Sequence, residues 1–397
     1  MKRSDIIGKH FFLTVLFLLC ISIGQAQLRQ ADSSSVYRSL IPIEKQNLLR
    51  NIDMIANMQM GFRSDFENGD HIQSRFRIEQ FRLEIKGYVH KRIFFRFRHR
   101  YTSDFQPQSV DKIIKGVDFA YLRFDISDKV QLTLGKTYAD WGGIEFDLNP
   151  IDIYEYSDII EQADNFLTGV GIYWQAMEKH GFSFQILNSR TSTFEEIYQG
   201  IPDLESSEIP LAAVVNWRGS FFDGKFTTLW SYSVFNEAKD TFKNYFAFGN
   251  QLTLDKIKIA YDFKYSMEDL DRTGIISRDV PDELYPYALE NTLYYSHWTK
   301  IDWRFHEKWQ LSFVGFIDKA KWLDDIDPLK TTDDWRTGYG YIPSIEYFPW
   351  SDINLKFFLS FVGRNYNYSQ YAKDRVGVSD YNTGRIMIGI ISPLHIF

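Results

Sequence analysis

The feature that most constrains this chain is a two-residue alternation of apolar and polar side chains, which recurs along most of its length. Ile353, Leu355 and Phe357, for example, alternate with Asn354 and Lys356. A period of two puts successive side chains on opposite faces of a β-strand, so each such segment has one apolar and one polar face. Beyond the N-terminal segment no apolar run reaches the length of a helical membrane span. The alternation therefore predicts an all-β protein.

Sixteen segments carry this alternation, and the connections between them are alternately short and long. An even number of antiparallel strands, with short turns at one end and long outer loops at the other, is typical of outer-membrane barrels. The strands of a soluble β-sandwich also alternate apolar and polar side chains, but its connections would not be alternately short and long in this way. We therefore predict a 16-stranded antiparallel transmembrane β-barrel. The predicted strands are residues 51–63, 72–89, 92–104, 115–126, 129–137, 165–175, 179–189, 208–219, 225–236, 244–254, 256–266, 290–304, 308–318, 335–348, 353–365 and 382–393.

Two local details of this pattern can be checked. In the second segment the apolar positions change phase between Ile78 and Phe81, which predicts a β-bulge near Glu79. Residues 65–70 and 237–243 fall where long connections alternate with short ones, so both are predicted to be longer outer loops.

The aromatic content supports a membrane barrel. The chain has 34 Phe, 24 Tyr and 10 Trp, yet 24% of its residues are charged. A transmembrane barrel needs both, because rings girdle its outside and polar groups line its inside. The net charge of −7 argues against nucleic acid as a partner.

The N-terminus has the pattern of an export signal. A basic start is followed by a 13-residue apolar core, Phe11 to Ile23, and a small-residue exit that ends at Ala26. We predict a signal peptide over residues 1–26, a periplasmic lead-in over residues 27–50 and the barrel over residues 51–397. The single cysteine, Cys20, lies in the signal, so no disulfide or cysteine-based metal site is expected.

The third outer loop, residues 137–165, interrupts the alternation for longer than an ordinary connection does. It contains eight carboxylates and no Lys or Arg, together with large apolar side chains such as Trp141, Phe146 and Ile151. A solvated surface loop would tolerate the charges. The apolar groups indicate instead that the loop packs against something, because a disordered acidic segment lacks them. The second interpretation is a loop folded into the barrel lumen.

A basic stretch of the sequence is the counterpart of the acidic loop. Arg82 and Lys86 share the polar face of one strand, and Arg96, Arg98 and Arg100 share that of the next. They are either ordinary solvated charges in a wet lumen or a pore-lining basic wall. In the second case we expect the wall to face the constriction-loop residues across the narrowest section, where opposed charges would create a transverse field. The expected constriction-loop residues are Asp140, Glu145, Asp147 and Asp152.

Motifs of catalysis and metal binding do not stand out. The sequence has no Gly-x-Ser-x-Gly elbow, no phosphate-binding P-loop and no His-Glu-x-x-His pair. The histidines are scattered rather than spaced as ligands. We therefore predict that the chain is not an enzyme, and we expect no cofactor and no metal.

Several stretches resemble the phosphate-selective porin O and P family in its Bacteroidetes form. They are FRIEQFRLEIKG (76–87), FFRFR (94–98), FAYLRF (119–124), LTLGK (132–136) and SIEYFP (344–349). The resemblance implies a Gram-negative outer-membrane porin, a homotrimer of 16-stranded barrels, each a passive diffusion channel for small hydrophilic solutes or ions. It also implies that the third outer loop enters the channel, and that Phe397 is the terminal aromatic read by the assembly machinery.

One departure from the family bears on selectivity. The named phosphate pores line their constriction with Arg and Lys, some on the third loop, whereas this loop has neither. We therefore expect a weakly selective channel that takes anions such as phosphate without a tight phosphate site. A closed barrel that serves as a surface adhesin or scaffold is the alternative, and conductance in planar bilayers separates the two.

The seventh outer loop is the other acidic surface of the chain. Its carboxylates are Asp324, Asp325, Asp327, Asp333 and Asp334. They either solubilise an exposed tip or contact outer-membrane lipid and lipopolysaccharide through divalent cations, which prefer oxygen ligands.

Overall fold

The computed structural model describes residues 52–324 and 327–396. The predicted signal peptide and periplasmic lead-in lie outside the described residues, as do Asp325 and Phe397. Within the described part, no helix is both long and apolar enough to cross a membrane.

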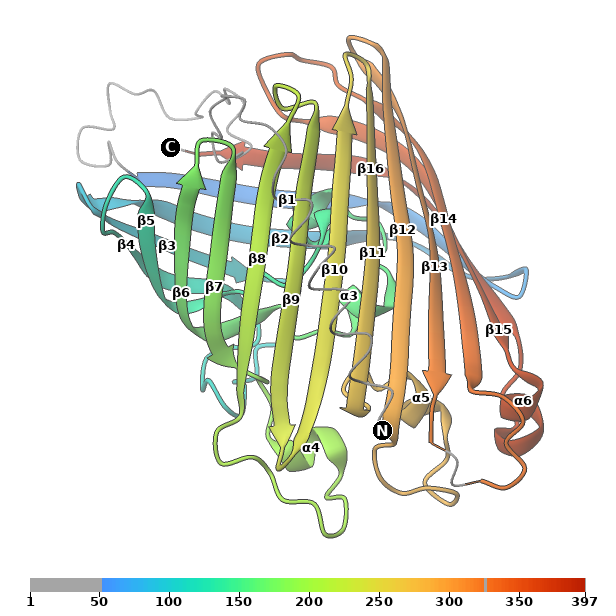
Figure 1. Cartoon of the computed structure of the whole chain (residues 1–397). Coiled ribbons are helices and arrows are strands. Elements are labelled where there is room, and N and C mark those ends of the chain that lie inside the picture. The colour runs from blue at the N-terminus through green and yellow to red at the C-terminus, as the bar shows by residue number, and fades with distance from the viewer. Residues whose placement is uncertain (1–51, 325–326, 397) are drawn as a thin grey trace.

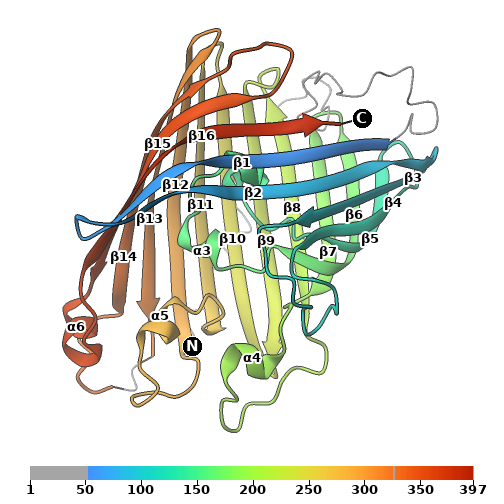
Figure 2. The same ribbon diagram turned by 180° about the vertical axis from the view of Figure 1, so that it is seen from behind.

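Sixteen antiparallel strands form one closed barrel, in which each strand pairs with its neighbours in sequence and β1 pairs with β16 (Figures 1 and 2). This confirms the predicted fold class. The strands are β1 (Ile52–Glu67), β2 (Asp70–His90), β3 (Ile93–Arg100), β4 (Val117–Asp125), β5 (Val130–Tyr138), β6 (Phe166–Met177), β7 (His180–Asn188), β8 (Leu211–Phe221), β9 (Phe226–Ala238), β10 (Thr241–Thr253), β11 (Ile257–Leu270), β12 (Glu290–His306), β13 (Trp309–Trp322), β14 (Asp334–Tyr347), β15 (Lys356–Tyr368) and β16 (Tyr381–His395).

Short helices lie in the longer connections. α4 (Phe194–Tyr198), α5 (Ile275–Asp279) and α6 (Gln370–Val376) lie at the same end of the barrel, which is the lower end in Figure 1. The third outer loop contains α2 (Ile144–Asp147), the 3₁₀ turn η2 (Pro150–Asp152) and α3 (Asp158–Glu161). Short turns close the opposite end, as the alternation of short and long connections along the sequence predicts.

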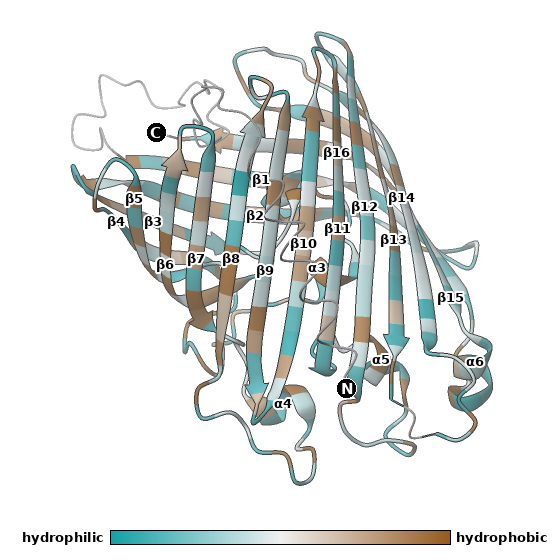
Figure 3. Ribbon diagram, viewed as in Figure 1, coloured by the Kyte–Doolittle hydropathy of each residue, from teal (hydrophilic) through white to brown (hydrophobic). Residues whose placement is uncertain are grey.

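The two faces of each strand differ as the alternation requires, and hydrophobic and hydrophilic bands alternate along the strands in Figure 3. On β11, Asp262 and Lys264 are fully buried, whereas Ile259 and Tyr261 are 37% and 39% exposed. The apolar face therefore points outward and the polar face inward. Lipid contact on one side and polar contact on the other explain why such different residues alternate.

Two of the predicted long outer loops are wrong, because the strands continue to tight turns. β1 and β2 are joined by Asn68 and Gly69, whose φ angles are +50° and +89°. An Asn-Gly pair adopts these angles readily, and a turn of this kind matches the twist of the flanking strands. β9 and β10 are likewise joined by Lys239 and Asp240, the latter with φ of +60°.

The predicted β-bulge is confirmed. Gln59 of β1 pairs with Gln80 of β2, but the next residue, Met60, pairs with Ile78, so Glu79 is the extra residue on β2. Because the bulge adds one residue to β2, the apolar side chains before and after it lie on the same face of the strand, although their positions in the sequence are out of phase.

The outward face supplies a prediction about stability. Ile388 lies at the middle of β16 and is 58% exposed, whereas Phe357 lies near the end of β15 and is 45% exposed. Ile388→Arg should lower the free energy of unfolding by ~2–4 kcal/mol, and Phe357→Arg, which lies opposite Ile390 and so nearer the turn, by less, because the cost of a lipid-facing charge falls with distance from the midplane. Denaturant titration in liposomes measures both. Equal losses would show that the membrane band is misplaced.

Candidate functional site

The third outer loop, residues 139–165 in the structure, is fastened to the inward faces of several strands. At its first helix, α2, the backbone N–H groups of Ile144 and Glu145 donate to the two carboxylate oxygens of Asp262 on β11, at 2.8 and 2.7 Å. Gly143 allows this approach, because a Cβ there would lie 2.6 Å from the Asp262 carboxyl group. The loop backbone thus lies directly on the wall.

A buried ion pair holds the same part of the loop. The Glu145 carboxylate pairs with the ammonium group of Lys264 on β11, and both side chains are fully buried. The N–H and O–H groups of Ser157 also donate to Glu145, at 2.7 and 2.6 Å. One carboxylate therefore fastens α2 to the wall and to the segment that precedes α3.

The start of the loop is fixed to β8 and β10. Arg218 of β8 donates to Asp140 at 2.8 Å and to Asp147 at 3.0 Å. Trp141 is buried, and its ring lies edge-on to that of Tyr245 on β10, with centroids 4.4 Å apart. Polar and apolar contacts together fix this end.

The middle of the loop is fixed to a different part of the wall. Lys356 of β15 pairs with Asp152 at 2.8 Å. Ile151, which is fully buried, packs in a cluster with Phe358 of β15 and Ile391 of β16. Here again a salt bridge and an apolar contact act side by side.

α3 begins at the densest ionic contact. Asp158 accepts from Arg364 of β15 at 2.6 Å and from Arg336 of β14 at 2.5 Å. Arg364 also donates to Asp318 of β13 at 3.2 Å and to the carbonyl oxygen of Tyr156 at 3.0 Å. One arginine therefore joins two strands and the loop.

The partners of the loop lie on well-separated strands. Besides the contacts above, Arg385 of β16 donates to Glu155 at 2.9 Å. In the strand order of the closed barrel, β8 and β16 are half a circuit apart. The loop therefore has ionic contacts with distant parts of the wall.

Seven of the eight loop carboxylates are paired with Arg or Lys. They are Asp140, Glu145, Asp147, Asp152, Glu155, Asp158 and Asp164. The eighth, Glu161 at the end of α3, has no ion pair within the described residues, and its side chain is exposed. The surrounding protein nevertheless desolvates its carboxyl group, and this burial, with the nearby charge of Glu155, raises the pKa of Glu161 to about 7.

The five basic residues predicted to form a wall lie side by side on β2 and β3. In the strand register Arg82 lies opposite Arg100, and Lys86 opposite Arg96. Arg96 and Arg98 also stack over the ring of Phe119, at 4.3 and 4.1 Å from its centroid.

Two carboxylates on the same wall partly neutralise these arginines. Glu84 lies 3.0 Å from Arg96, and Asp118 of β4 lies 3.0 Å from Arg98 and 3.7 Å from Arg82. Arg100 donates at 3.4 Å to the hydroxyl of Ser103 and, in the described part of the chain, has no carboxylate partner. Three guanidinium groups thus share two carboxylates, and the fourth, that of Arg100, has none in the described part of the chain.

The structure does not pair the four arginines of the wall with the carboxylates of the loop in the described part of the chain. Within the described residues no ion pair joins Arg82, Arg96, Arg98 or Arg100 to a carboxylate of the third outer loop. The loop carboxylates pair instead with cations that sequence reasoning did not single out, namely Arg218, Lys264, Arg272, Arg336, Lys356, Arg364 and Arg385. All but Arg272 lie on strands. The one sequence signal that could have identified these residues is their position in the two-residue alternation, which places them on the polar, inward face of the strand.

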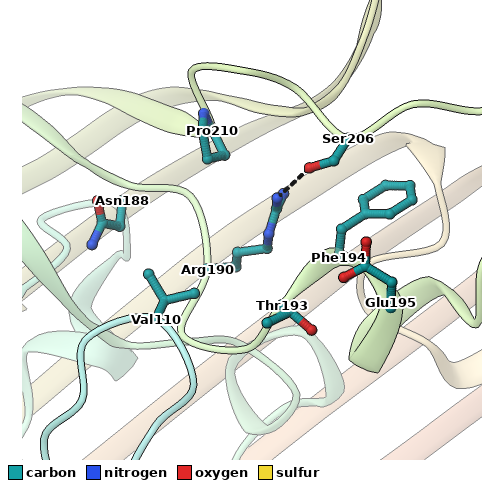
Figure 4. A pocket seen from close by; sticks show the side chains of 8 residues that line it. All are labelled: Val110, Asn188, Arg190, Thr193, Phe194, Glu195, Ser206 and Pro210. Carbon is teal, nitrogen blue, oxygen red and sulfur yellow. Dashed lines mark hydrogen bonds between the residues drawn. The ribbon is translucent and has the colours of Figure 1, made fainter.

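A separate pocket lies among the outer loops, close to α4 (Figure 4). Its volume is about 200 Å³, and Val110, Thr193 and Phe194 form part of its lining. Its arginine, Arg190, is engaged, because it donates at 2.9 Å to Ser206 and at 2.8 Å to the carbonyl oxygen of Glu237. Among the described residues no group of three or more His, Cys, Asp or Glu side chains could hold a metal ion.

Comparisons with known proteins agree with this architecture. The family model for phosphate-selective porin O and P matches residues 52–389. No curated protein matches the chain.

Three solved structures illustrate the likeness in fold. The outer-membrane channel DcaP of Acinetobacter baumannii has a TM-score of 0.60 at 10% identity, over 87% of this chain and 98% of that one. The anion-selective porin from Comamonas acidovorans has 0.56 at 9%, over 86% and 99%. OmpF of Salmonella typhi, in complex with daunomycin, has 0.57 at 11%, over 85% and 98%. At such identities the likeness shows the fold alone.

Proposed function

This chain belongs to the phosphate-selective porin O and P family and is a passive channel of the Gram-negative outer membrane; we propose that its third outer loop narrows the lumen and leaves a weakly anion-selective passage beside the basic wall. The observation that carries this proposal is the anchoring of one loop to strands on distant parts of a closed barrel. A segment tied to inward side chains on both sides has to cross the space between them.

The distribution of the strand residues that form ion pairs with the loop supports a passage beside β2 and β3. They lie on β8, β11 and β14 to β16, while β2 and β3 supply no ion pair to the loop in the described part of the chain. The side of the section next to β2 and β3 is therefore the part to which the loop makes no ion pair. Solutes would pass there.

Unsatisfied hydrogen-bond donors support a preference for anions. The buried Nε atoms of Arg82, Arg96 and Arg100, and the buried side-chain amide nitrogen of Gln59 on β1, have no hydrogen-bond partner among the described residues. Buried donors of this kind are costly unless something accepts from them. Because these atoms are buried, a passing anion would meet the positive charge of the guanidinium groups and would not bond to the Nε atoms themselves.

Tight phosphate binding is not part of the proposal. Capture of a phosphate needs several arginines whose planar ends converge freely on its oxygens. Here Arg96 and Arg98 already bond to Glu84 and Asp118 and stack on Phe119. Carboxylates within this wall also repel an approaching anion. The passage should therefore favour anions in general, by charge rather than by a specific site.

Reversal potentials under a KCl gradient test this function. Arg100→Gln and Arg82→Gln should each shift the potential toward cation preference, because each removes a positive charge from the passage. Arg375→Gln, on α6, is the matched control and should behave as the unmodified channel. Millimolar phosphate should leave the chloride current unblocked. A pore without conductance, unchanged potentials in both variants, or block by phosphate would each contradict the proposal.

The partners follow from the family rather than from contacts on this chain. We propose a homotrimer embedded in outer-membrane lipid and lipopolysaccharide, with small hydrophilic solutes or anions as cargo. The mass of the detergent-solubilised complex tests the trimer. No observation favours the alternative of a closed adhesin or scaffold.

A further inference from the structure

We propose that Glu161 is the selectivity-determining residue of this channel, a carboxylate whose negative charge opposes Arg100 across the passage and weakens anion preference only when it is ionised. This inference rests on the proposed function, since it assumes that ions pass beside the basic wall. Among the eight loop carboxylates, Glu161 is the one without an ion pair in the described part of the chain.

The first support is the contrast between Glu161 and its neighbours on the loop. Asp158, three residues earlier, is held by Arg336 and Arg364, and Asp164, three residues later, pairs with Arg272. A carboxylate in an ion pair has its field largely cancelled by its partner. Glu161 has no such partner within the described residues, and solvent reaches its side chain. Its charge therefore acts on mobile ions.

The second support is the matching property of Arg100. In the described part of the chain this side chain has no carboxylate partner, and its Nε atom is buried without an acceptor. Arg100 is close enough for its charge to act on the Glu161 carboxyl group. One unpaired anion and one unpaired cation thus lie near each other, one on the loop and one on the wall.

The groups around Glu161 set the pH at which it ionises. Burial and the negative charges of Glu155 and Glu145 favour the neutral form, while Arg364 of β15 and Arg100 of β3 favour the ionised form. The balance raises the pKa of Glu161 to about 7, against about 4.3 for a free glutamate. The side chain is therefore neutral at pH 5 and negative at pH 9. The same shift means that its contribution to folding stability is present at low pH and is lost as the pH rises through 7.

The sign of the effect on permeation follows. Below pH 7 the passage carries only the excess positive charge of the wall, so anions are preferred most. Above pH 7 the Glu161 charge cancels part of it. One unit charge at about 8 Å in a water-like dielectric, screened by physiological salt, changes the local concentrations of anions and cations by about 1.4-fold each and in opposite directions, so the anion-to-cation permeability ratio should fall about twofold between pH 5 and pH 9.

The experiment uses the full mature barrel in planar bilayers, with reversal potentials recorded in a KCl gradient from pH 5 to pH 9. The unmodified channel should show the fall, centred near pH 7. Glu161→Gln should abolish it and keep the low-pH ratio throughout. Glu283→Gln, at an exposed carboxylate of the loop between β11 and β12, should retain it. Arg100→Gln should move the midpoint above pH 7, because Arg100 favours the ionised form of Glu161.

The outcomes separate this inference from the proposed function. A conducting, anion-preferring channel whose pH step survives in Glu161→Gln, or that has no pH step at all, would overturn the role of Glu161 alone. A barrel that does not conduct, or that shows no anion preference at pH 5, would overturn the proposed function as well. Heat modifiability on a gel confirms in each case that the variant barrel is folded.

Discussion

Lys264→Met is expected to destabilise the folded protein by ~3–5 kcal/mol, the usual cost of removing one partner from a buried ion pair. Lys264 and Glu145 are both fully buried. The variant would leave the Glu145 carboxylate fully buried and without a counter-ion. The remaining donor, Ser157, cannot replace the lost charge. We expect the structure to respond by releasing α2 from β11, which would raise the single-channel conductance.

Two further variants make this result interpretable. Lys258→Met removes an exposed lysine from the same face of β11, nearer the end of the strand, and should be almost silent. Combining Lys264→Met with Glu145→Gln should recover much of the loss, because neutral side chains of similar size replace a buried pair at little cost. Conductance and the denaturant midpoint are measured together. Equal behaviour of Lys258→Met and Lys264→Met would refute the anchoring role of the pair.

Arg364→Met should have an effect of similar size on another part of the wall. It removes donors from Asp158, from Asp318 and from the carbonyl oxygen of Tyr156 in one step. Arg336 still holds Asp158, but Asp318 would lose its only arginine partner in the described part of the chain. A loss of ~3–5 kcal/mol in unfolding free energy follows from the burial of these charges.

The readout for Arg364→Met is the denaturant midpoint, together with the open-channel noise, which should rise as α3 becomes mobile. Arg375→Met is the control of like chemistry, because Arg375 pairs with Asp327 on the exposed surface, where an ion pair contributes about 0–1 kcal/mol. If the two variants lose the same stability, the network at α3 has no special role.

The barrel could be predicted because lipid and water impose a rule on every strand. One face must be apolar and the other polar, so the period of two marks sixteen strands without any knowledge of their partners. The bulge at Glu79 was visible for the same reason. The turn at Asn68 and Gly69 breaks the alternation of short and long connections, and the Asn-Gly pair, a strong hairpin signal, is the local feature of the sequence that indicates it.

The candidate site could be predicted only in part. The basic wall followed from parity, since Arg82 and Arg98 lie on the inward faces of adjacent strands. The partners of the loop did not follow, because nothing near Asp158 in the sequence indicates that Arg364 will meet it. Such pairings depend on where closure of the barrel places each strand. The sequence shows the charges and not the distances between them.

The long separations in this network also have a consequence for biogenesis. The acceptors Tyr154 and Glu155 are 231 and 230 residues away from Arg385 along the chain. While β11 to β16 are still emerging, six of the seven cations that pair with the loop, all but Arg218 of β8, are not yet in place. The contacts of the loop are therefore complete only after β16 and its Arg385 have joined the barrel, as the final step of assembly. A chaperone that meets a half-built barrel would find a mobile acidic segment, whereas a finished barrel has hidden it.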